Sequence, residues 1–321
     1  MRALAVTILV LALLGATAAA FAVTEALKLE RSPIGAPRFS RAFSPTCDCR
    51  KASARLSLRL RRDETVDASV VDSRGHVVRT LVAGRDYAPG RIRLSWNGRD
   101  DRDKVVPDGN YRLRVHLARE RRTIVVPNVV RVDTAPPRVR LVDVAPLAFS
   151  PDGDGRNDTA AVSFRLSERA RVLVFANGEL SAARPRQKQG AGKLVWAGKV
   201  RGVPLRAGEY ALTLRAEDQA GNRSAPTDQV LVLVRYVELA RTELRARAGG
   251  LLRFRVESDA ARIRWVLTRS RSSGRPLRSG SAAPGRVAVR VPRRLAPGRY
   301  VLRVSENGHA ASASVRVRAG S

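Results

Sequence analysis

Residues 43–60 read FSPTCDCRKASARLSLRL, and residues 149–166 read FSPDGDGRNDTAAVSFRL. At a constant offset of 106, with no gap, nine of these 18 positions are identical. Each copy continues into a run in which apolar and polar residues alternate, as at Leu56, Leu58 and Leu60. Such a period of two is typical of a strand with one buried face. The repeat therefore indicates that the chain contains the same β-domain twice.

The agreement resumes downstream, where Trp96-Asn97-Gly98 matches Trp196-Ala197-Gly198. Both elements lead to a Gly-x-Tyr triplet and another alternating run, and a third triplet, ending at Tyr300, follows without either of the other motifs. Turn signals recur at the spacing of a sandwich, and helical periodicity is absent after the N-terminal segment. We predict an all-β protein of three tandem immunoglobulin-like β-sandwich domains, the third diverged.

The domain boundaries are placed at breaks in this pattern. Asp133-Thr134-Ala135-Pro136-Pro137 contains a proline pair that removes backbone donors. Val230 to Val234 is an apolar run expected for a buried last strand. The predicted segments are a linker at 25–37 and domains at 38–135, 136–237 and 238–321.

The N-terminal segment predicts export. Met1-Arg2 is followed by 21 residues without a charge, Ala3 to Val23. Small residues around Ala20 resemble a signal-peptide cleavage site, and the same run is long enough to span a bilayer. Residues 1–24 are therefore a signal peptide or a transmembrane anchor, and the remainder is expected to be secreted or to lie at the outer face of the membrane.

The chain is strongly basic. It has 60 Lys and Arg against 29 Asp and Glu, a net charge of +31. The basic residues are scattered from end to end, without interleaved aromatics or a recognition motif, which argues against nucleic acid as the partner. An anionic envelope polymer, lipid headgroups or another surface protein are the expected partners, with membrane contact through the N-terminal segment.

The first two domains resemble the FlgD/Vpr-type immunoglobulin-like family. The resemblance lies in residues 72–81, DSRGHVVRTL, and in the blocks WNGRD at 96–100 and VPDGNY at 106–111. The second copy also resembles C-terminal modules of bacterial surface proteins, through residues 149–155 and 217–222. Together these resemblances cover about residues 43–236. They imply an assembly scaffold, a stalk or an accessory module, and a flagellar role would be analogy alone.

The acidic loop of the second copy is a candidate metal site. Its aspartates, with two residues expected from another loop, offer the hard oxygen ligands that Ca²⁺ takes in sets of six to eight. The alternative is a turn stabilised by its own Asx side chains, because the EF-hand pattern is absent. In the first copy most of these features are lost, so no metal is expected there. The candidate calcium ligands are Asp152, Asp154, Asp158, Asp218 and Asn222.

Cys47 and Cys49 are the only cysteines. An exported protein meets oxidising conditions, so a disulfide between them is the first interpretation. It would close a small ring and constrain little of the unfolded chain. An intermolecular bridge and a soft-metal pair are the alternatives.

No nucleophile or metalloprotease motif occurs, and three histidines offer few candidates for a general base. The chain is therefore predicted not to be an enzyme. Trp96 and Trp196 are expected in the cores rather than as sugar platforms. The predicted function is that of a structural or interaction module of the cell surface or envelope. The alternative, a secreted carbohydrate-binding or enzyme-accessory protein, would need exposed aromatic side chains.

Overall fold

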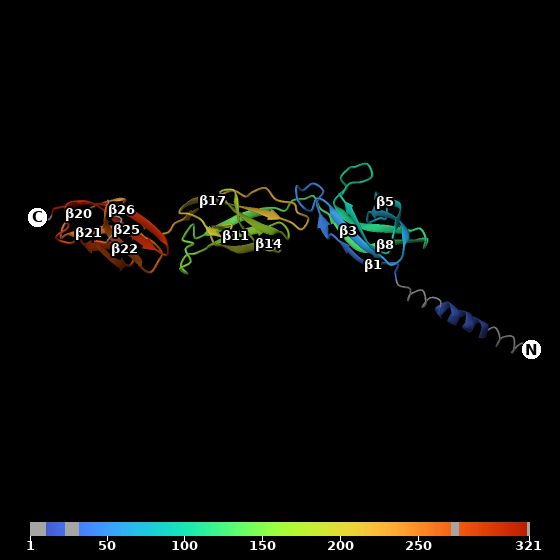
Figure 1. The fold of residues 1–321 in the computed structure, drawn as a ribbon. Coiled ribbons are helices and arrows are strands. Elements are labelled where there is room, and N and C mark those ends of the chain that lie inside the picture. The colour runs from blue at the N-terminus through green and yellow to red at the C-terminus, as the bar shows by residue number, and fades with distance from the viewer. Residues whose placement is uncertain (1–10, 23–31, 271–275, 320–321) are drawn as a thin grey trace, which may run out of the picture. The chain divides into compact units, whose positions relative to one another are not determined.

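The structure is a computed structural model that describes residues 11–22, 32–270 and 276–319. Within those ranges the regular elements are strands, apart from a helix over residues 11–22, which confirms the prediction of an all-β protein (Figure 1). The chain divides into two compact units, Met1–Thr134 and Ala135–Ser321. The first unit contains one sandwich and the second contains two.

The N-terminal apolar segment is described only in part. In the helix over residues 11–22, the Thr17 hydroxyl lies within hydrogen-bond distance of the Leu13 and Leu14 carbonyl oxygens. Across the described ranges, no helix combines the length and the hydrophobicity needed to cross a bilayer. The rest of the predicted signal peptide or membrane anchor, residues 1–10 and 23–24, lies outside the described residues.

The first sandwich has a three-stranded sheet, β1-β3-β6, and a five-stranded sheet, β2-β8-β7-β4-β5. Strand β2 pairs in parallel with β8. The alternating pattern places Leu56 and Leu58 of β3 in the core and leaves Arg55 and Arg59 exposed. The strands are β1 Ile34–Phe39, β2 Ala42–Phe43, β3 Ala54–Leu60, β4 Glu64–Val71, β5 Val77–Tyr87, β6 Gly90–Trp96, β7 Gly109–Leu117 and β8 Arg122–Val132.

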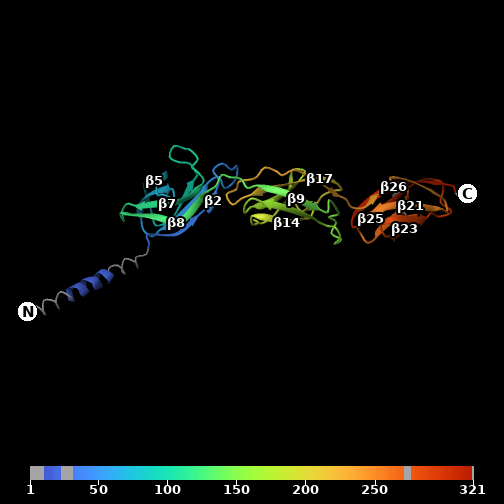
Figure 2. The same cartoon turned by 180° about the vertical axis from the view of Figure 1, so that it is seen from behind.

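The second sandwich repeats this arrangement, with sheets β9-β11-β14 and β10-β18-β17-β12-β13 (Figures 1 and 2). Strand β10 pairs in parallel with β18, as β2 does with β8. The strands are β9 Val139–Ala145, β10 Ala148–Phe149, β11 Ala160–Leu166, β12 Arg171–Ala176, β13 Glu179–Ala183, β14 Gly190–Trp196, β15 Lys199–Val200, β16 Val203–Pro204, β17 Gly208–Glu217 and β18 Val230–Val234.

The third sandwich keeps the same strand order, with sheets β19-β21-β24 and β20-β26-β25-β22-β23. Its tryptophan, Trp265, comes from β22 and packs against Gly280, where an added Cβ would lie 2.6 Å from the indole. The strands are β19 Glu238–Leu239, β20 Glu243–Arg247, β21 Leu251–Glu257, β22 Ile263–Arg269, β23 Arg278–Ala282, β24 Gly285–Arg290, β25 Gly298–Glu306 and β26 His309–Arg318.

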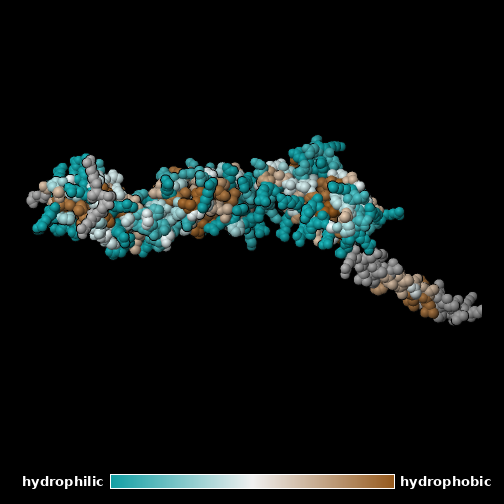
Figure 3. Space-filling view, in the orientation of Figure 1, coloured by the Kyte–Doolittle hydropathy of each residue, from teal (hydrophilic) through white to brown (hydrophobic). Residues whose placement is uncertain are grey.

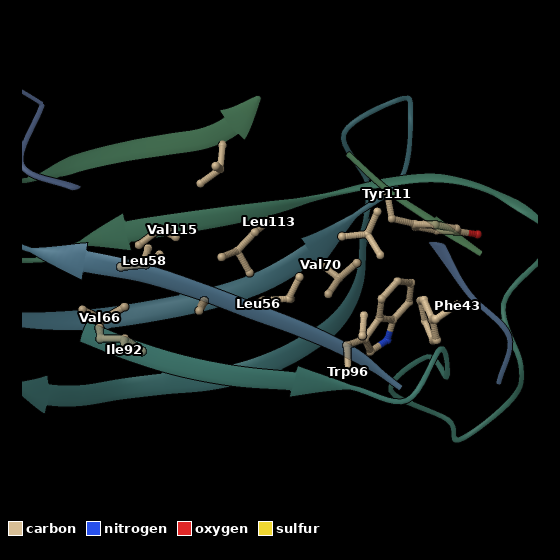
Figure 4. Packing of buried hydrophobic residues seen from close by; sticks show 14 of the residues in the cluster. Phe43, Leu56, Leu58, Val66, Val70, Ile92, Trp96, Tyr111, Leu113 and Val115 are labelled. Atoms are coloured by element: carbon tan, nitrogen blue, oxygen red, sulfur yellow. The ribbon is translucent and has the colours of Figure 1, made fainter. Parts of the chain in front are cut away.

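One end of the core explains why the FSP and Trp-x-Gly motifs repeat together. In the first sandwich Trp96 packs edge-on against Phe43 and Tyr111, with ring centroids 5.4 and 5.0 Å away (Figure 4). In the second, Phe149 and Trp196 pack in the same way at 5.3 Å. The two motifs, distant in the sequence, are the two halves of one aromatic contact.

The glycine of the Trp-x-Gly motif is required by the same contact. Gly98 has a φ of +73°, and an added Cβ would lie 2.9 Å from Pro45. Gly198 has a φ of +56°, and its Cβ would lie 2.7 Å from Phe149. Side chains other than hydrogen are therefore excluded both by space and by backbone conformation.

The Gly-x-Tyr triplets mark a tyrosine corner in each sandwich. Each tyrosine stands near the start of its strand and donates its hydroxyl hydrogen to the carbonyl oxygen four residues upstream, as in immunoglobulin-like domains. The bonds are Tyr111 to Pro107 at 2.8 Å, Tyr210 to Arg206 at 3.1 Å and Tyr300 to Ala296 at 2.6 Å. This bond is common to all three sandwiches, including the diverged third.

Candidate functional site

The acidic loop of the second sandwich holds three of the predicted calcium ligands together. Carboxylate oxygens of Asp152, Asp154 and Asp158 all lie within 4.8 Å of one another. Both oxygens of Asp158 accept hydrogen bonds from loop backbone, from the amides of Gly153 at 2.5 Å and Gly155 at 2.7 Å. Asp158 therefore serves the shape of the loop, as the Asx-turn alternative expected.

The first sandwich holds the corresponding loop differently. The frame is shared, because the Ser44 amide donates to the Lys51 carbonyl as the Ser150 amide donates to the Asn157 carbonyl. Cys47 and Cys49 are joined by a disulfide. At the offset of the repeat these are the positions of Gly153 and Gly155. A disulfide thus holds this loop in the first copy, and hydrogen bonds to the Asp158 carboxylate hold it in the second.

Asp218 and Asn222 do not join the acidic loop, which corrects the predicted five-residue site. They follow the last residue of β17, whereas Asp152 lies beside the first, and ten strand residues separate the two ends by about 30 Å. The Asp218 carboxylate already accepts the amides of Gly221 and Asn222 and the Asn222 side chain. These two residues form a closed turn.

The structure instead brings Asp152 to two acids of the third sandwich. Asp259 lies in the turn after β21, and Glu306 is the last residue of β25. Carboxylate oxygens of these three residues lie within 4.8 Å of one another. Sequence reasoning missed Asp259 and Glu306, since each is a single acid outside any ligand-spacing motif. Only the folded chain brings the three together.

The second and third sandwiches meet closely around this cluster. The side-chain amide of Asn307, in the β25–β26 turn, donates to the Asp152 carbonyl oxygen at 2.6 Å. His309 stacks on Tyr236 with ring centroids 3.5 Å apart, and the Tyr236 hydroxyl donates to the Leu205 carbonyl. The Asn307-Gly308 turn is a sequence signal that could have located the hairpin tip, because such pairs favour two-residue hairpins.

Burial and mutual repulsion act on the acids of this junction. Burial raises the pKa of Glu306 to about 7, a hydrogen bond from Ser258 lowers it, and a side-chain hydrogen bond with Asp152 and the charges of Asp152 and Asp259 raise it. Burial also raises the pKa of Asp259, as do the charges of the acidic loop, while a backbone hydrogen bond lowers it. Carboxyl groups this close resist simultaneous ionisation unless a cation lies among them.

A different feature marks the three-stranded sheet of the first sandwich. A groove on its outer face is lined by arginine, serine and leucine side chains of β1, β3 and β6 and carries no acid. In the register of the strands Arg59 faces Arg91, a like-charge pair that weakens the sheet. No ion pair of the described residues involves these arginines. The groove residues are Arg38, Arg55, Leu56, Ser57, Arg91, Arg93, Leu94 and Ser95.

The tryptophans belong to the cores. Trp96 and Trp196 are 1% exposed and Trp265 is 7% exposed. The three histidines lie apart, His76 beside Asp72, His116 beside Thr123 and His309 on Tyr236. Hydrophilic residues cover most of the visible face of the sandwiches, as Figure 3 shows.

A known protein family matches part of the first sandwich. Residues 45–120 match the FlgD Ig-like domain family, which confirms the predicted resemblance there. No curated protein sequence matches the chain closely enough to count as a relative.

Solved structures with a similar fold are distant. The BSP domain of a biofilm associated protein is 19% identical over 63% of this chain and 30% of that chain, with a TM-score of 0.23. A titin tandem is 9% identical over 89% of this chain and 100% of that chain, with a TM-score of 0.30. Bacteroides ovatus SGBP-B, in complex with a mixed-linkage heptasaccharide, is 14% identical over 89% and 71%, with a TM-score of 0.21.

Proposed function

We propose, on the premise that residues 45–120 are an FlgD Ig-like domain, that this chain is a non-catalytic interaction module of an exported cell-surface protein. Its ligand is an anionic polymer of the envelope, bound in the arginine groove of the first sandwich. The N-terminal apolar run of the sequence supports export, and the groove is the observation that carries the choice of ligand.

The groove has the chemistry that an anionic polymer needs. Arg38, Arg55, Arg91 and Arg93 are exposed side chains that project from three adjacent strands. Each guanidinium offers planar, forked donors that match phosphate, sulfate or carboxylate groups. A polymer with repeated anionic groups can contact several of them at once. It would also relieve the repulsion between facing arginines.

The alternative, a carbohydrate-binding protein that stacks sugars on aromatic rings, loses its main support. That alternative depended on exposed aromatic side chains, and all three tryptophans are buried. Recognition through charge is therefore favoured over recognition through stacking.

The test compares two double substitutions that remove the same charge. Binding of the full chain to fluorescent dextran sulfate is measured for Arg91→Gln with Arg93→Gln and for Arg165→Gln with Lys193→Gln. The control pair lies on the corresponding sheet of the second sandwich. We expect the first pair to weaken binding about tenfold, the loss of about 1.4 kcal/mol of charge-assisted bonding.

The control pair is expected to weaken binding by less than about twofold, because exposed charges outside the contact are screened by salt. Equal losses for the two pairs would show that net charge alone attracts the polymer and would overturn the proposed groove. Neutral dextran should not bind. Tighter binding of duplex DNA than of dextran sulfate at physiological salt would favour nucleic acid instead.

A further inference from the structure

We propose that the junction between the second and third sandwiches binds a calcium ion. The protein ligands are the carboxylates of Asp152, Asp259 and Glu306 and the hydroxyl of Ser150. Asp152 and Ser150 belong to the loop after β10, whereas Asp259 and Glu306 belong to the third sandwich. The site is independent of the arginine groove, which lies in the other unit.

Buried oxygens without partners point to this ligand. With the carboxyl groups ionised, the buried side-chain atoms of the described residues that lack a hydrogen-bond partner are Ser150 Oγ, Asp152 Oδ2, Asp259 Oδ1 and Glu306 Oε1. All four belong to this junction. Ser150 is 2% exposed and Glu306 is 8% exposed, so water does not readily solvate either side chain. Buried polar atoms are normally satisfied, and four exceptions in one place call for a common partner.

The chemistry of the four atoms selects a hard cation. Three are carboxylate oxygens and one is a hydroxyl oxygen, all of which Ca²⁺ accepts as ligands. A cavity of about 80 Å³ is lined by Ser150, Ser258 and Asp259, and also by Arg235, whose guanidinium pairs with Glu257 at 3.2 Å. That space leaves room for the waters that complete a coordination shell of six to eight oxygens. No ion pair in the described ranges supplies a basic side chain to Asp152, Asp259 or Glu306.

The acidic loop by itself is the weaker site. Both oxygens of Asp158 accept backbone amides, and Asp154 Oδ1 accepts the amide of Arg156. Asp152 uses one oxygen for the Asp154 amide and leaves Oδ2 unpartnered. The loop thus prepares a single carboxylate ligand beside the Ser150 hydroxyl, and the third sandwich supplies the other two carboxylates.

An ion held in this way would couple the two sandwiches. Only three residues separate the end of β18 from the start of β19, and Asn307 already contacts the Asp152 backbone. The two positive charges of the ion would offset most of the repulsion among three carboxylates that face each other across the junction. Calcium should therefore stabilise the second and third sandwiches against separate unfolding.

The test is calorimetric titration of the chelator-treated full chain with CaCl₂. We expect one site with a Kd of about 1 mM or tighter, the range of extracellular modules. Glu306→Gln and, as a second variant, Asp259→Asn should each weaken binding at least about tenfold. Asp143→Asn, an exposed acid on β9, is the matched control and should change the affinity by less than about twofold. Thermal unfolding of each variant without calcium checks that it folds.

Two results would overturn the site. One is a wild-type chain that binds no calcium at concentrations up to about 5 mM. The other is strong loss of binding in Asp158→Asn with none in Glu306→Gln and Asp259→Asn, which would place the ion in the loop alone. As a second readout, calcium should raise the unfolding temperature of the wild type and raise that of Glu306→Gln much less.

Discussion

The first and second sandwiches are copies that hold the same loop by different chemistry. In the first, a disulfide links Cys47 and Cys49, and in the second the Asp158 carboxylate bonds the amides of Gly153 and Gly155. Cys47 and Cys49 correspond to Gly153 and Gly155 in the repeat. The loop of the first sandwich, closed by the disulfide, has no acid other than Asp48. The loop of the second sandwich, held by a carboxylate, stays acidic, and so only this copy can provide Asp152 to a cation.

The outer face of the three-stranded sheet is more basic in the first copy than in the second. On the three-stranded sheet, Arg55 and Arg91 of the first sandwich correspond to Ala161 and Ala191 of the second. The buried positions of β3 remain apolar in the second copy, where Val162 and Phe164 correspond to Leu56 and Leu58. A duplicated core has thus kept one frame while surface substitutions produced one basic face and one acidic edge.

Truncating the core tryptophans should have the largest effect. Trp96→Ala and Trp196→Ala each remove a fully buried indole, and each should cost its own sandwich about 3–5 kcal/mol. Hydrogen exchange followed by mass spectrometry reports the loss separately in each sandwich. Leu180→Ala, at an exposed site, is the control and should change stability by less than about 0.5 kcal/mol. Destabilisation of both sandwiches by Trp96→Ala would contradict the expectation that each tryptophan stabilises only its own sandwich.

Substituting the motif glycines should have an intermediate effect. Gly98→Ala and Gly198→Ala place a Cβ 2.9 Å from Pro45 and 2.7 Å from Phe149, and overpacking of this kind costs about 1–3 kcal/mol. Chemical denaturation of each variant gives the measurement. Gly75→Ala shares the positive φ but meets no atom within 4 Å, so it isolates the backbone cost of about 1 kcal/mol. Similar losses at all three glycines would mean that the aromatic contact is not tight.

The smallest effects should come from removing the bonds that hold the two loops, the Asp158 hydrogen bonds and the disulfide of Cys47 and Cys49. Asp158→Ala removes two charge-assisted bonds and should cost the second sandwich about 1–2 kcal/mol. Cys47→Ser with Cys49→Ser opens a very short ring and should cost the first sandwich about 1–2 kcal/mol. Hydrogen exchange with and without a thiol reductant separates the two. Reductant should speed hydrogen exchange in the loop of the first sandwich only. An equal increase in the second would contradict the conclusion that different bonds hold the two loops.

Much of the fold could be predicted because its signals are local. Alternation at Leu56, Leu58 and Leu60 indicated a half-buried strand, and the Gly-x-Tyr triplets located equivalent strands in all three sandwiches. The candidate site was predictable only in part, since Asp152, Asp154 and Asp158 are neighbours in the sequence. Asp218 and Asn222 were assigned to it wrongly, because a sequence does not show at which end of a sandwich a loop emerges.

The sequence by itself determined the all-β class, the duplication and the excess of basic side chains, because strand periodicity, repeats and charge are properties of consecutive residues. Only the tertiary structure decided that Phe43 meets Trp96 and that arginines of three strands line one groove. It also decided that Asp259 and Glu306 meet Asp152. These contacts depend on strand register and on the packing of one sandwich against the next, and packing joins residues that are far apart in the chain.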